Sequence, residues 1–424
     1  MNEFQRGRIG AINLHVLPTK VFKTFAISLY AGIPLAENTV TPVALTPFVL
    51  RRGTASTPET IAFREKLDDL YGAGFGFDVY KRGDAQIVQF RMDVINDQFV
   101  SASQPLLAEA LTFLGDVVSK PLLEEGTFRS SYVESEKETL RNRLQAIVND
   151  KIRYSAERCV EEMCKNEPYR LQALGRLDDI AGISPEALYQ NYSAWLDHAA
   201  FDLYVAGDTT LEEVAELAGK AFKLKPRQPG AYGAPDKGYS IKETNYVVEE
   251  MDVNQGKLNM GLRTGITYGD DAYAAMLMYN GILGGYPHSK LFRNVREKES
   301  LAYYASSRLD GHKGICAIQS GIEFQNYEKA LEIITEQLAS MSKGELSDLE
   351  MNQTKAMIMG HLREIQDSAY EMIAYDFNGV LSGNLRTRDE LMAQIAAIKP
   401  EDVAEVGKHV RLETVYFLRN RKEA

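Results

Sequence analysis

Alternating and helical apolar patterns follow one another along the chain and predict a mixture of strands and helices. The stretch FKTFAISLYAG alternates polar and apolar residues, as expected for a half-buried strand. GFGFDVYKRGDAQIVQF contains two strand-like runs around a Gly-containing turn, which predicts an antiparallel hairpin. Long helical patterns cover residues 122–165 and 346–380, where Tyr, Met and Leu recur among charged residues. Both kinds of element are therefore expected in quantity.

A shorter helix is predicted within TPETIAFREKLDDLYG. Ile61, Leu67 and Leu70 recur there at helical spacing. Thr57 is a candidate N-cap, and Pro58 would occupy the first helical position, where its missing N–H costs nothing.

Several stretches of the first half are echoed in the same order in the second half. FREKLDDLYGAGFGF, from Phe63, is echoed by FRNVREKESLAYYAS, from Phe292, and both lead into a Gly-containing turn and a second strand. IAGISPEAL, from Ile180, is echoed by IAAIKPEDV, from Ile395, and a closing strand follows in each half. We therefore predict a duplicated α+β fold with two homologous domains, each an antiparallel sheet with helices packed on one face.

The boundary between the two halves is expected in residues 223–240, which contain three prolines and several glycines. Such composition favours a linker over packed secondary structure. The predicted domains are therefore residues 1–222 and residues 241–424.

Composition and charge exclude several classes of function. Acidic residues outnumber basic ones, 59 to 48, and the resulting net charge of −11 would repel a nucleic-acid backbone. The first residues form no secretory signal, and no segment reaches the roughly 18 apolar residues of a membrane span. Cys159, Cys164 and Cys316 have no metal-ligand spacing and are expected to be buried, reduced thiols. We therefore expect a cytoplasmic protein that binds neither nucleic acid nor membrane.

The most specific motif is NGILGGYPHSKLFRNVREKESLAYYASS, residues 280–307. It resembles the second-domain signature of the pitrilysin/insulinase family of zinc metallopeptidases, which has a Gly pair, Ser-x-Leu-Phe, Arg-Glu and Leu-x-Tyr. The matching residues are Gly284, Gly285, Ser289, Leu291, Phe292, Arg296, Glu297, Leu301 and Tyr303. The resemblance covers essentially the whole chain and is weaker in the first half.

The resemblance implies a zinc motif, His-x-x-Glu-His, on a first-domain helix that precedes a Gly-Thr turn. Anchored on Gly53-Thr54, the five motif positions are Ala44, Leu45, Thr46, Pro47 and Phe48. The third ligand would lie at Asn142 or Arg143, and a guanidinium cannot bind a cation. No metal is therefore expected on this chain. Pro47 would bend or break the helix, which is expected either to fill the core or to form a repurposed pocket.

In the family, an Arg and a Tyr seven positions apart bind the substrate backbone and stabilise the oxyanion. The resemblance assigns these roles to Arg296 and Tyr303, whereas the residues alone would be read as a salt-bridging Arg and a strand Tyr. Tyr304 would point to the opposite strand face and serve the structure.

The family also implies a substrate-pairing strand in YGAGFGFDVYKRG, residues 71–83. Its backbone would bind an extended peptide, with Gly72, Gly74 and Phe75 as substrate-binding residues. Gly72, Gly74 and Gly76 could allow close backbone approach, and they could equally mark a bulge or a bend.

These features resemble the non-catalytic subunit of a heterodimeric zinc peptidase. Arg296 and Tyr303 would act in trans on the active site of a homologous partner, which would hold the zinc and cleave unfolded peptides. A homodimer is an alternative when the chain is alone. The alternative function is a peptide-binding or scaffold protein of the same fold without a role in proteolysis, and a third is an autonomous peptidase with a different metal site.

Overall fold

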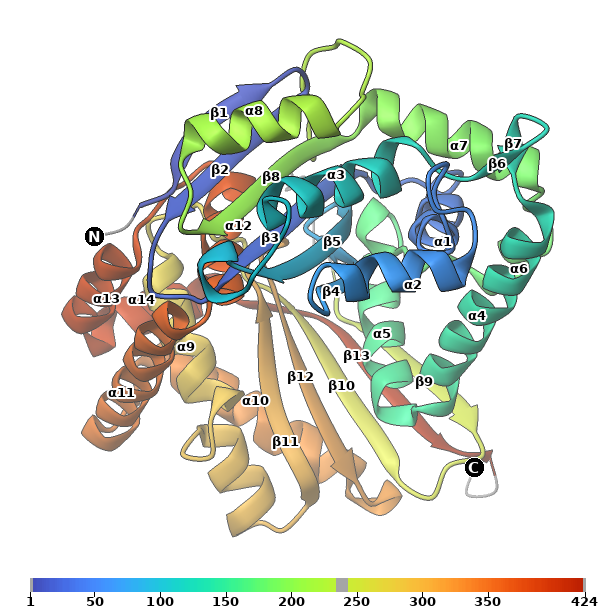
Figure 1. Ribbon diagram of the computed structural model, residues 1–424. Helices are drawn as coiled ribbons and strands as arrows, with labels where there is room; N and C mark the ends of the chain where they lie inside the picture. Colours follow the sequence, from blue (N-terminus) through green and yellow to red (C-terminus); the bar gives the residue numbers. More distant parts are fainter. Residues whose placement is uncertain (1–2, 234–242, 422–424) are drawn as a thin grey trace. The chain divides into compact units, whose positions relative to one another are not determined.

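The computed structural model describes residues 3–233 and 243–421, which form two compact units, and Figure 1 shows the order of their elements. Unit 1 consists of the chain up to Gln145, the stretch from Leu171 to residue 233, and Ser368–Asp376. Unit 2 consists of Ala146–Arg170, the stretch from residue 243 to Asp367, and the chain from Phe377. Each unit therefore includes a short segment from the other half of the chain. Residues 234–240 of the expected linker lie outside the described residues.

Unit 1 contains a six-stranded sheet in the order β1-β2-β8-β3-β5-β4. Its strands are β1 (Gln5–Ile9), β2 (Ile12–Pro18), β3 (Thr24–Pro34), β4 (Gly74–Arg82), β5 (Ala85–Ile95) and β8 (Ala200–Gly207). All neighbours are antiparallel except β2 and β8, which are parallel. The sheet is thus antiparallel as predicted, apart from β2 and β8, which strands β3, β4 and β5 and several helices, rather than a hairpin, separate in the chain.

The predicted half-buried strand is β3, and it is buried along almost its whole length. It lies between β8 and β5, and its polar side chains find partners inside the sheet. Gln89 donates hydrogen bonds to Ser28 Oγ at 3.4 Å and to the Tyr30 hydroxyl at 3.1 Å. The alternation of polar and apolar residues therefore predicted the strand correctly but not its burial, because polar groups with hydrogen-bond partners can be buried.

Helices cover the sheet of unit 1 and connect its strands. They are α1 (Val40–Leu50), α2 (Thr60–Asp69), α3 (Leu106–Ser119), α4 (Ser130–Asn149), α6 (Leu177–Ile180), α7 (Pro185–His198) and α8 (Leu211–Ala221). A small hairpin of β6 (Leu123–Glu124) and β7 (Thr127–Phe128) precedes α4. Helix α2 begins two residues later than predicted, with Glu59 at the N-cap, because the Thr57 hydroxyl is bonded to Thr54 Oγ1 at 2.8 Å instead. Ile61 is 72% exposed and does not belong to the apolar face that we expected.

Unit 2 repeats this plan with a five-stranded sheet in the order β11-β12-β10-β13-β9. Its strands are β9 (Asn245–Met251), β10 (Gly256–Arg263), β11 (Ala302–Asp310), β12 (Ile315–Ile322) and β13 (Arg411–Asn420). Its helices are α5 (Lys151–Met163), α9 (Tyr273–Asn280), the π-helices η3 (Gly281–Gly285) and η4 (Phe292–Lys298), α10 (Tyr327–Lys343), α11 (Asp348–Glu364), α12 (Ala369–Ser382), α13 (Arg388–Ala397) and α14 (Pro400–His409). Helix α12 begins in the segment that belongs to unit 1. Here β13 and β9 form the one parallel pair.

The echoes in the sequence correspond to equivalent elements. The series α2, β4, β5 in unit 1 matches η4, β11, β12 in unit 2. Pro185 and Pro400 each occupy the start of a helix, as predicted, and β8 and β13 follow those helices.

Ionic contacts hold the exchanged segments. Glu167, from Ala146–Arg170, pairs with Arg263, and its carboxylate also lies 2.8 Å from Lys313 Nζ. In unit 1, Asp376 accepts two hydrogen bonds from Arg6 at 2.6 Å and one from the Tyr204 hydroxyl at 2.8 Å. The exchanged segments are therefore integral parts of the units that they complete.

Within residues 3–233 and 243–421, no helix is long and apolar enough to cross a membrane.

Candidate functional site

Helix α1 carries the five positions to which the sequence resemblance assigned the family's zinc motif. All eleven of its residues are buried, and Ala44 and Phe48 have no exposed surface. The helix continues to Leu50 past Pro47, so the predicted break is absent. Complete burial stabilises the helix against the cost of the proline. The Thr46 hydroxyl also donates to the Pro42 carbonyl at 2.8 Å, which satisfies one backbone acceptor near the proline.

The structure brings Arg143, on α4, to the side of α1. Its guanidinium carbon lies 4.7 Å from the centre of the Phe48 ring, which is the distance of a cation–π contact. Phe48 and Arg143, the two positions assigned to zinc ligands, therefore lie close together. They carry an aromatic ring and a positive charge, which do not fit a zinc ion. Among the described residues, no three His, Cys, Asp or Glu side chains are grouped so as to hold a metal.

A second guanidinium, that of Arg51, also lies over the Phe48 ring. Arg51 lies 5.7 Å from the centre of the Phe48 ring and 5.4 Å from that of Phe77, and the two rings pack edge to face at 4.8 Å. Arg52 stacks on the ring of Tyr132 and pairs with the buried carboxylate of Glu136 at 3.3 Å. Two arginines, Arg51 and Arg143, are thus stacked on phenylalanine rings beside α1.

Arg296 lies on the π-helix η4 of unit 2 and is exposed. Its guanidinium carbon lies 4.4 Å from the centre of the Phe292 ring, one helical turn earlier. Arg296 forms no ion pair with the part of the chain that the structure describes. It is therefore not the salt-bridging Arg that the residues alone would suggest, and its donors face solvent.

Tyr303 is the extra residue of a β-bulge. Ala302 pairs with Ile322 and Tyr304 with Gly321, so no partner on β12 faces Tyr303. Bulges turn a side chain away from the regular sheet face, and Tyr303 is 62% exposed. Its hydroxyl donates to Glu323 Oε1 at 2.6 Å, and this hydrogen bond raises the tyrosine pKa.

Tyr304, by contrast, contributes to packing. Its ring lies over Gly321 on β12, where a Cβ atom would collide with it, and Lys257 Nζ lies 5.8 Å from the ring centre. Burial raises the pKa of Tyr304 to about 12. The structural role expected for this residue agrees with these contacts.

Strand β4 lies at one edge of the six-stranded sheet and pairs with β5 without a break in register. The glycines therefore do not mark a bulge, and each has its own role. Gly72 has φ of 72°, which only glycine adopts without strain, and a Cβ at Gly74 would collide with Asp93. A Cβ at Gly76 would meet nothing within 4 Å, and Gly76 is exposed. Close approach of another backbone is therefore open at Gly76.

The ring of Phe75 packs into an aromatic cluster of unit 1. Its centre lies 5.6 Å from that of Phe63 and 5.5 Å from that of Phe113. A contact of Phe75 with substrate would therefore use its backbone rather than its side chain.

Three contributors were not singled out from the sequence: Arg51, Phe77 and Glu323. Arg51 lies in the RRGT turn, and Phe77 follows Phe75 with a strand period of two. Both signals were present, but only the fold shows that the two side chains meet. Glu323 follows β12 directly and has no motif around it.

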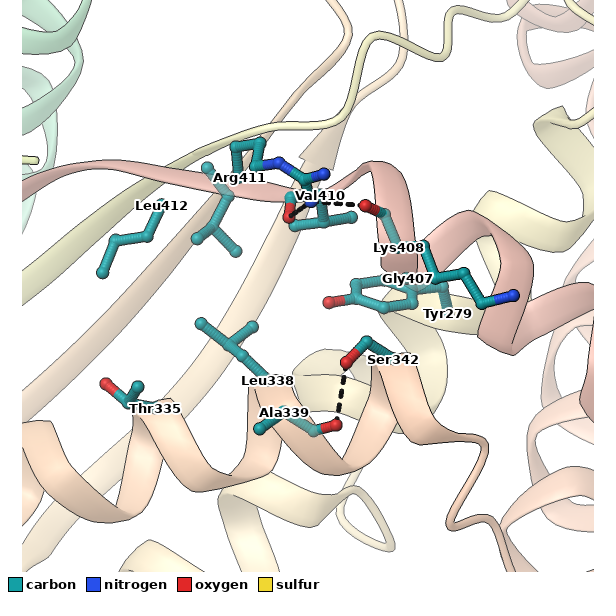
Figure 2. Close-up of a pocket in the computed structure, with 11 residues that line it drawn as sticks. Tyr279, Thr335, Leu338, Ala339, Ser342, Gly407, Lys408, Val410, Arg411 and Leu412 are labelled. Atoms are coloured by element: carbon teal, nitrogen blue, oxygen red, sulfur yellow. Dashed lines mark hydrogen bonds between the residues drawn. The ribbon is translucent and has the colours of Figure 1, made fainter. Parts of the chain in front are cut away.

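A pocket of about 400 Å³ lies in unit 2 between α10 and the start of β13 (Figure 2). Leu338 and Leu412 line it, and Arg411 donates to the Val410 carbonyl at 3.1 Å. The residues that line it include no carboxylate, imidazole or thiol, so the pocket lacks the side chains that usually bind a metal.

Comparison with known proteins shows the family to which the chain belongs. Residues 182–358 match the family described as the peptidase M16 inactive domain. Together with a relative of 39% identity along nearly the whole chain, this match shows that the protein belongs to the pitrilysin/insulinase (M16) family of metallopeptidases.

That relative is a Bacillus subtilis protein named probable inactive metalloprotease YmfF; the match spans 421 residues, 99% of this chain and 98% of the relative. A conserved protein from Enterococcus faecalis has a similar structure, with a TM-score of 0.93 at 31% identity over 100% of both chains. A protease from Helicobacter pylori shares the fold, with a TM-score of 0.82 at 15% identity over 99% of this chain and 100% of that one.

Proposed function

We propose that this chain is the non-catalytic subunit of a heterodimeric zinc metallopeptidase. Its partner would be a homologous subunit that carries His-x-x-Glu-His, holds the zinc and activates the water. The observation that carries the proposal is a contrast between the two units. The positions on α1 assigned to the two His and the Glu, Ala44, Pro47 and Phe48, are apolar and buried, whereas Arg296 and Tyr303 are exposed.

Arg296 and Tyr303 would act on the substrate in the partner's active site. A guanidinium and a phenol both donate hydrogen bonds, and such donors lower the barrier when they meet the negative charge of the tetrahedral intermediate. The Tyr303 hydroxyl now donates to Glu323. In the complex, a substrate oxygen would replace the Glu323 carboxylate as the acceptor of this hydrogen bond.

The test is co-expression with a His-x-x-Glu-His homologue from the same genome, followed by assay of the purified pair on an unfolded peptide. Replacement of Arg296 by Ala or Tyr303 by Phe should lower kcat by about a hundredfold, the usual cost of losing one oxyanion donor. Arg293→Ala, on the same π-helix, and Tyr246→Phe, a tyrosine that is 61% exposed on β9, are the matched controls.

Both controls should retain the activity and the assembly of the wild-type pair. Unchanged hydrolysis in the Arg296 and Tyr303 variants would refute the catalytic role and leave a scaffold. If the isolated chain bound stoichiometric zinc and hydrolysed peptides without a partner, the proposal that the partner subunit holds the zinc would be refuted.

A second function, the holding of extended peptides, is supported by β4. It is an edge strand with an open approach at Gly76 and an unbroken register with β5. Main-chain hydrogen bonding to such an edge accepts peptides of varied sequence. A peptide that is N-methylated at alternate residues should lose binding although its side chains are unchanged. Equal binding of the two peptides would contradict the use of the edge.

A further inference from the structure

The arginines beside α1 form a cluster whose charge is only partly balanced. Arg51 and Arg52 share one carboxylate, Glu136, which is 1% exposed, and Arg143 stacks on the ring of Phe48. Arg52 forms the closer pair with Glu136, at 3.3 Å. An excess of positive charge at one place is unusual for a chain with a net charge of −11.

Two of the three guanidiniums keep their hydrogen-bond donors available. Arg51 lies 3.7 Å from Glu136 Oε2, which is an ion pair but too long for a hydrogen bond, and that oxygen accepts none. Among the described residues, Arg143 contacts Phe48 and forms no ion pair. Both side chains are accessible: Arg51 is 39% exposed and Arg143 is exposed as well.

Stacking fixes these two groups in place. Each guanidinium lies over the ring of Phe48, which has no exposed surface, and Arg51 also lies over Phe77. A planar guanidinium held on an aromatic face loses little further freedom when its N–H groups bind an anion. Phe77 belongs to the edge strand β4, so the cluster lies beside the strand on which a peptide would be held.

We infer that Arg51 and Arg143 form a binding site for a carboxylate of a peptide held along β4. The carboxylate is either an acidic side chain or the C-terminal carboxylate of that peptide, since both present two oxygens to the donor fork of arginine. The inference rests on the proposed holding of peptides by β4 and is independent of the roles of Arg296 and Tyr303. The place that resembles a zinc site would thus select anionic peptides instead of binding a cation.

The experiment measures the affinity of the full chain for three labelled peptides by fluorescence anisotropy. The peptides share one extended sequence: the first has a central Glu and an amidated C-terminus, the second has Gln and an amide, and the third has Gln and a free carboxylate. At least one carboxylate peptide should bind about tenfold more tightly than the neutral one, as expected for a charge-assisted, two-pronged contact. Tighter binding of the Glu peptide would identify an acidic side chain as the ligand, and tighter binding of the peptide with the free C-terminus would identify the terminal carboxylate.

Arg143→Gln and Arg51→Gln should each remove most of this preference and leave the affinity for the neutral peptide unchanged. Arg141→Gln is the matched control, because Arg141 lies on the same helix but pairs with Glu138. Equal affinity for all three peptides would overturn the carboxylate site alone. A preference that persists in both variants would overturn it as well, and failure of every peptide to bind would overturn it together with peptide holding by β4.

Discussion

Replacement of Glu167 by Gln tests how strongly the exchanged segment Ala146–Arg170 is bound to unit 2. The Glu167 carboxylate pairs with Arg263 and lies 2.8 Å from Lys313 Nζ. The Arg263 and Lys313 side chains are 2% and 0% exposed, and that of Glu167 is 10% exposed. Glutamine keeps the shape of the side chain but removes the charge, which takes one carboxylate from two buried cations, while Arg263 keeps its pair with Glu413.

Loss of one partner from a buried ion pair costs about 3–5 kcal/mol of unfolding free energy. Glu413 continues to pair with Arg263, so we expect the lower end of that range, about 3 kcal/mol. Urea unfolding followed by far-UV circular dichroism measures the change. The control is Glu250→Gln: Glu250 pairs with Arg419, the two side chains are 39% and 36% exposed, and their loss should cost about 1 kcal/mol or less.

The effect should depend on pH in a defined direction. Burial by itself raises the pKa of Glu167, but hydrogen bonds from Arg263 and Lys313 outweigh it, and the net pKa is lowered. A pKa that is lower in the folded state stabilises the fold above the unfolded-state value and loses this effect as the pH falls through the folded-state value. The difference between wild type and Glu167→Gln should therefore be largest near neutrality and shrink below about pH 4. A difference under about 1 kcal/mol near neutrality would refute the reasoning.

Three further predictions concern the candidate sites. Phe48→Ala should lower the unfolding free energy by about 3–5 kcal/mol, because it empties a fully buried aromatic position, and chemical denaturation would measure the loss. Gly72→Ala should destabilise the protein by about 1 kcal/mol because of its positive φ, whereas Gly76→Ala should leave the melting temperature unchanged; equal shifts would contradict this assignment. Glu323→Gln should lower the pKa of Tyr303 towards the usual value of about 10, measured by NMR titration of the labelled ring, and an unchanged pKa would show that the hydrogen bond is absent in solution.

Much of the fold could be predicted because local patterns dictate it. The repeated order of helix, strand, turn and strand, and the prolines at two helix starts, are signals that lie within a few residues. The parallel pairing of β2 with β8 could not be predicted, because it depends on a crossover that spans most of unit 1. The burial of β3 likewise depends on partners, such as Gln89, that are distant in sequence.

The candidate sites show the same limit. The lack of ligand side chains at residues 44–48 could be read from the residue types alone, whereas the stacking of Arg51 and Arg143 on Phe48 required α1 and α4 to meet. The bulge that presents Tyr303 depends on register with β12, and one sequence carries no signal of register at this point.

The exchange of segments between the units has a consequence for how the protein can be made and divided. Ribosomal synthesis releases Arg6 and Tyr204 long before Asp376, the residue that neutralises Arg6, so unit 1 is finished only when nearly the whole polypeptide has been translated. If the gene were split between the two halves, the first product would contain α5, although this helix belongs to unit 2, and the second product would lack it. A cut between the halves of the chain would therefore separate each unit from a segment that it contains.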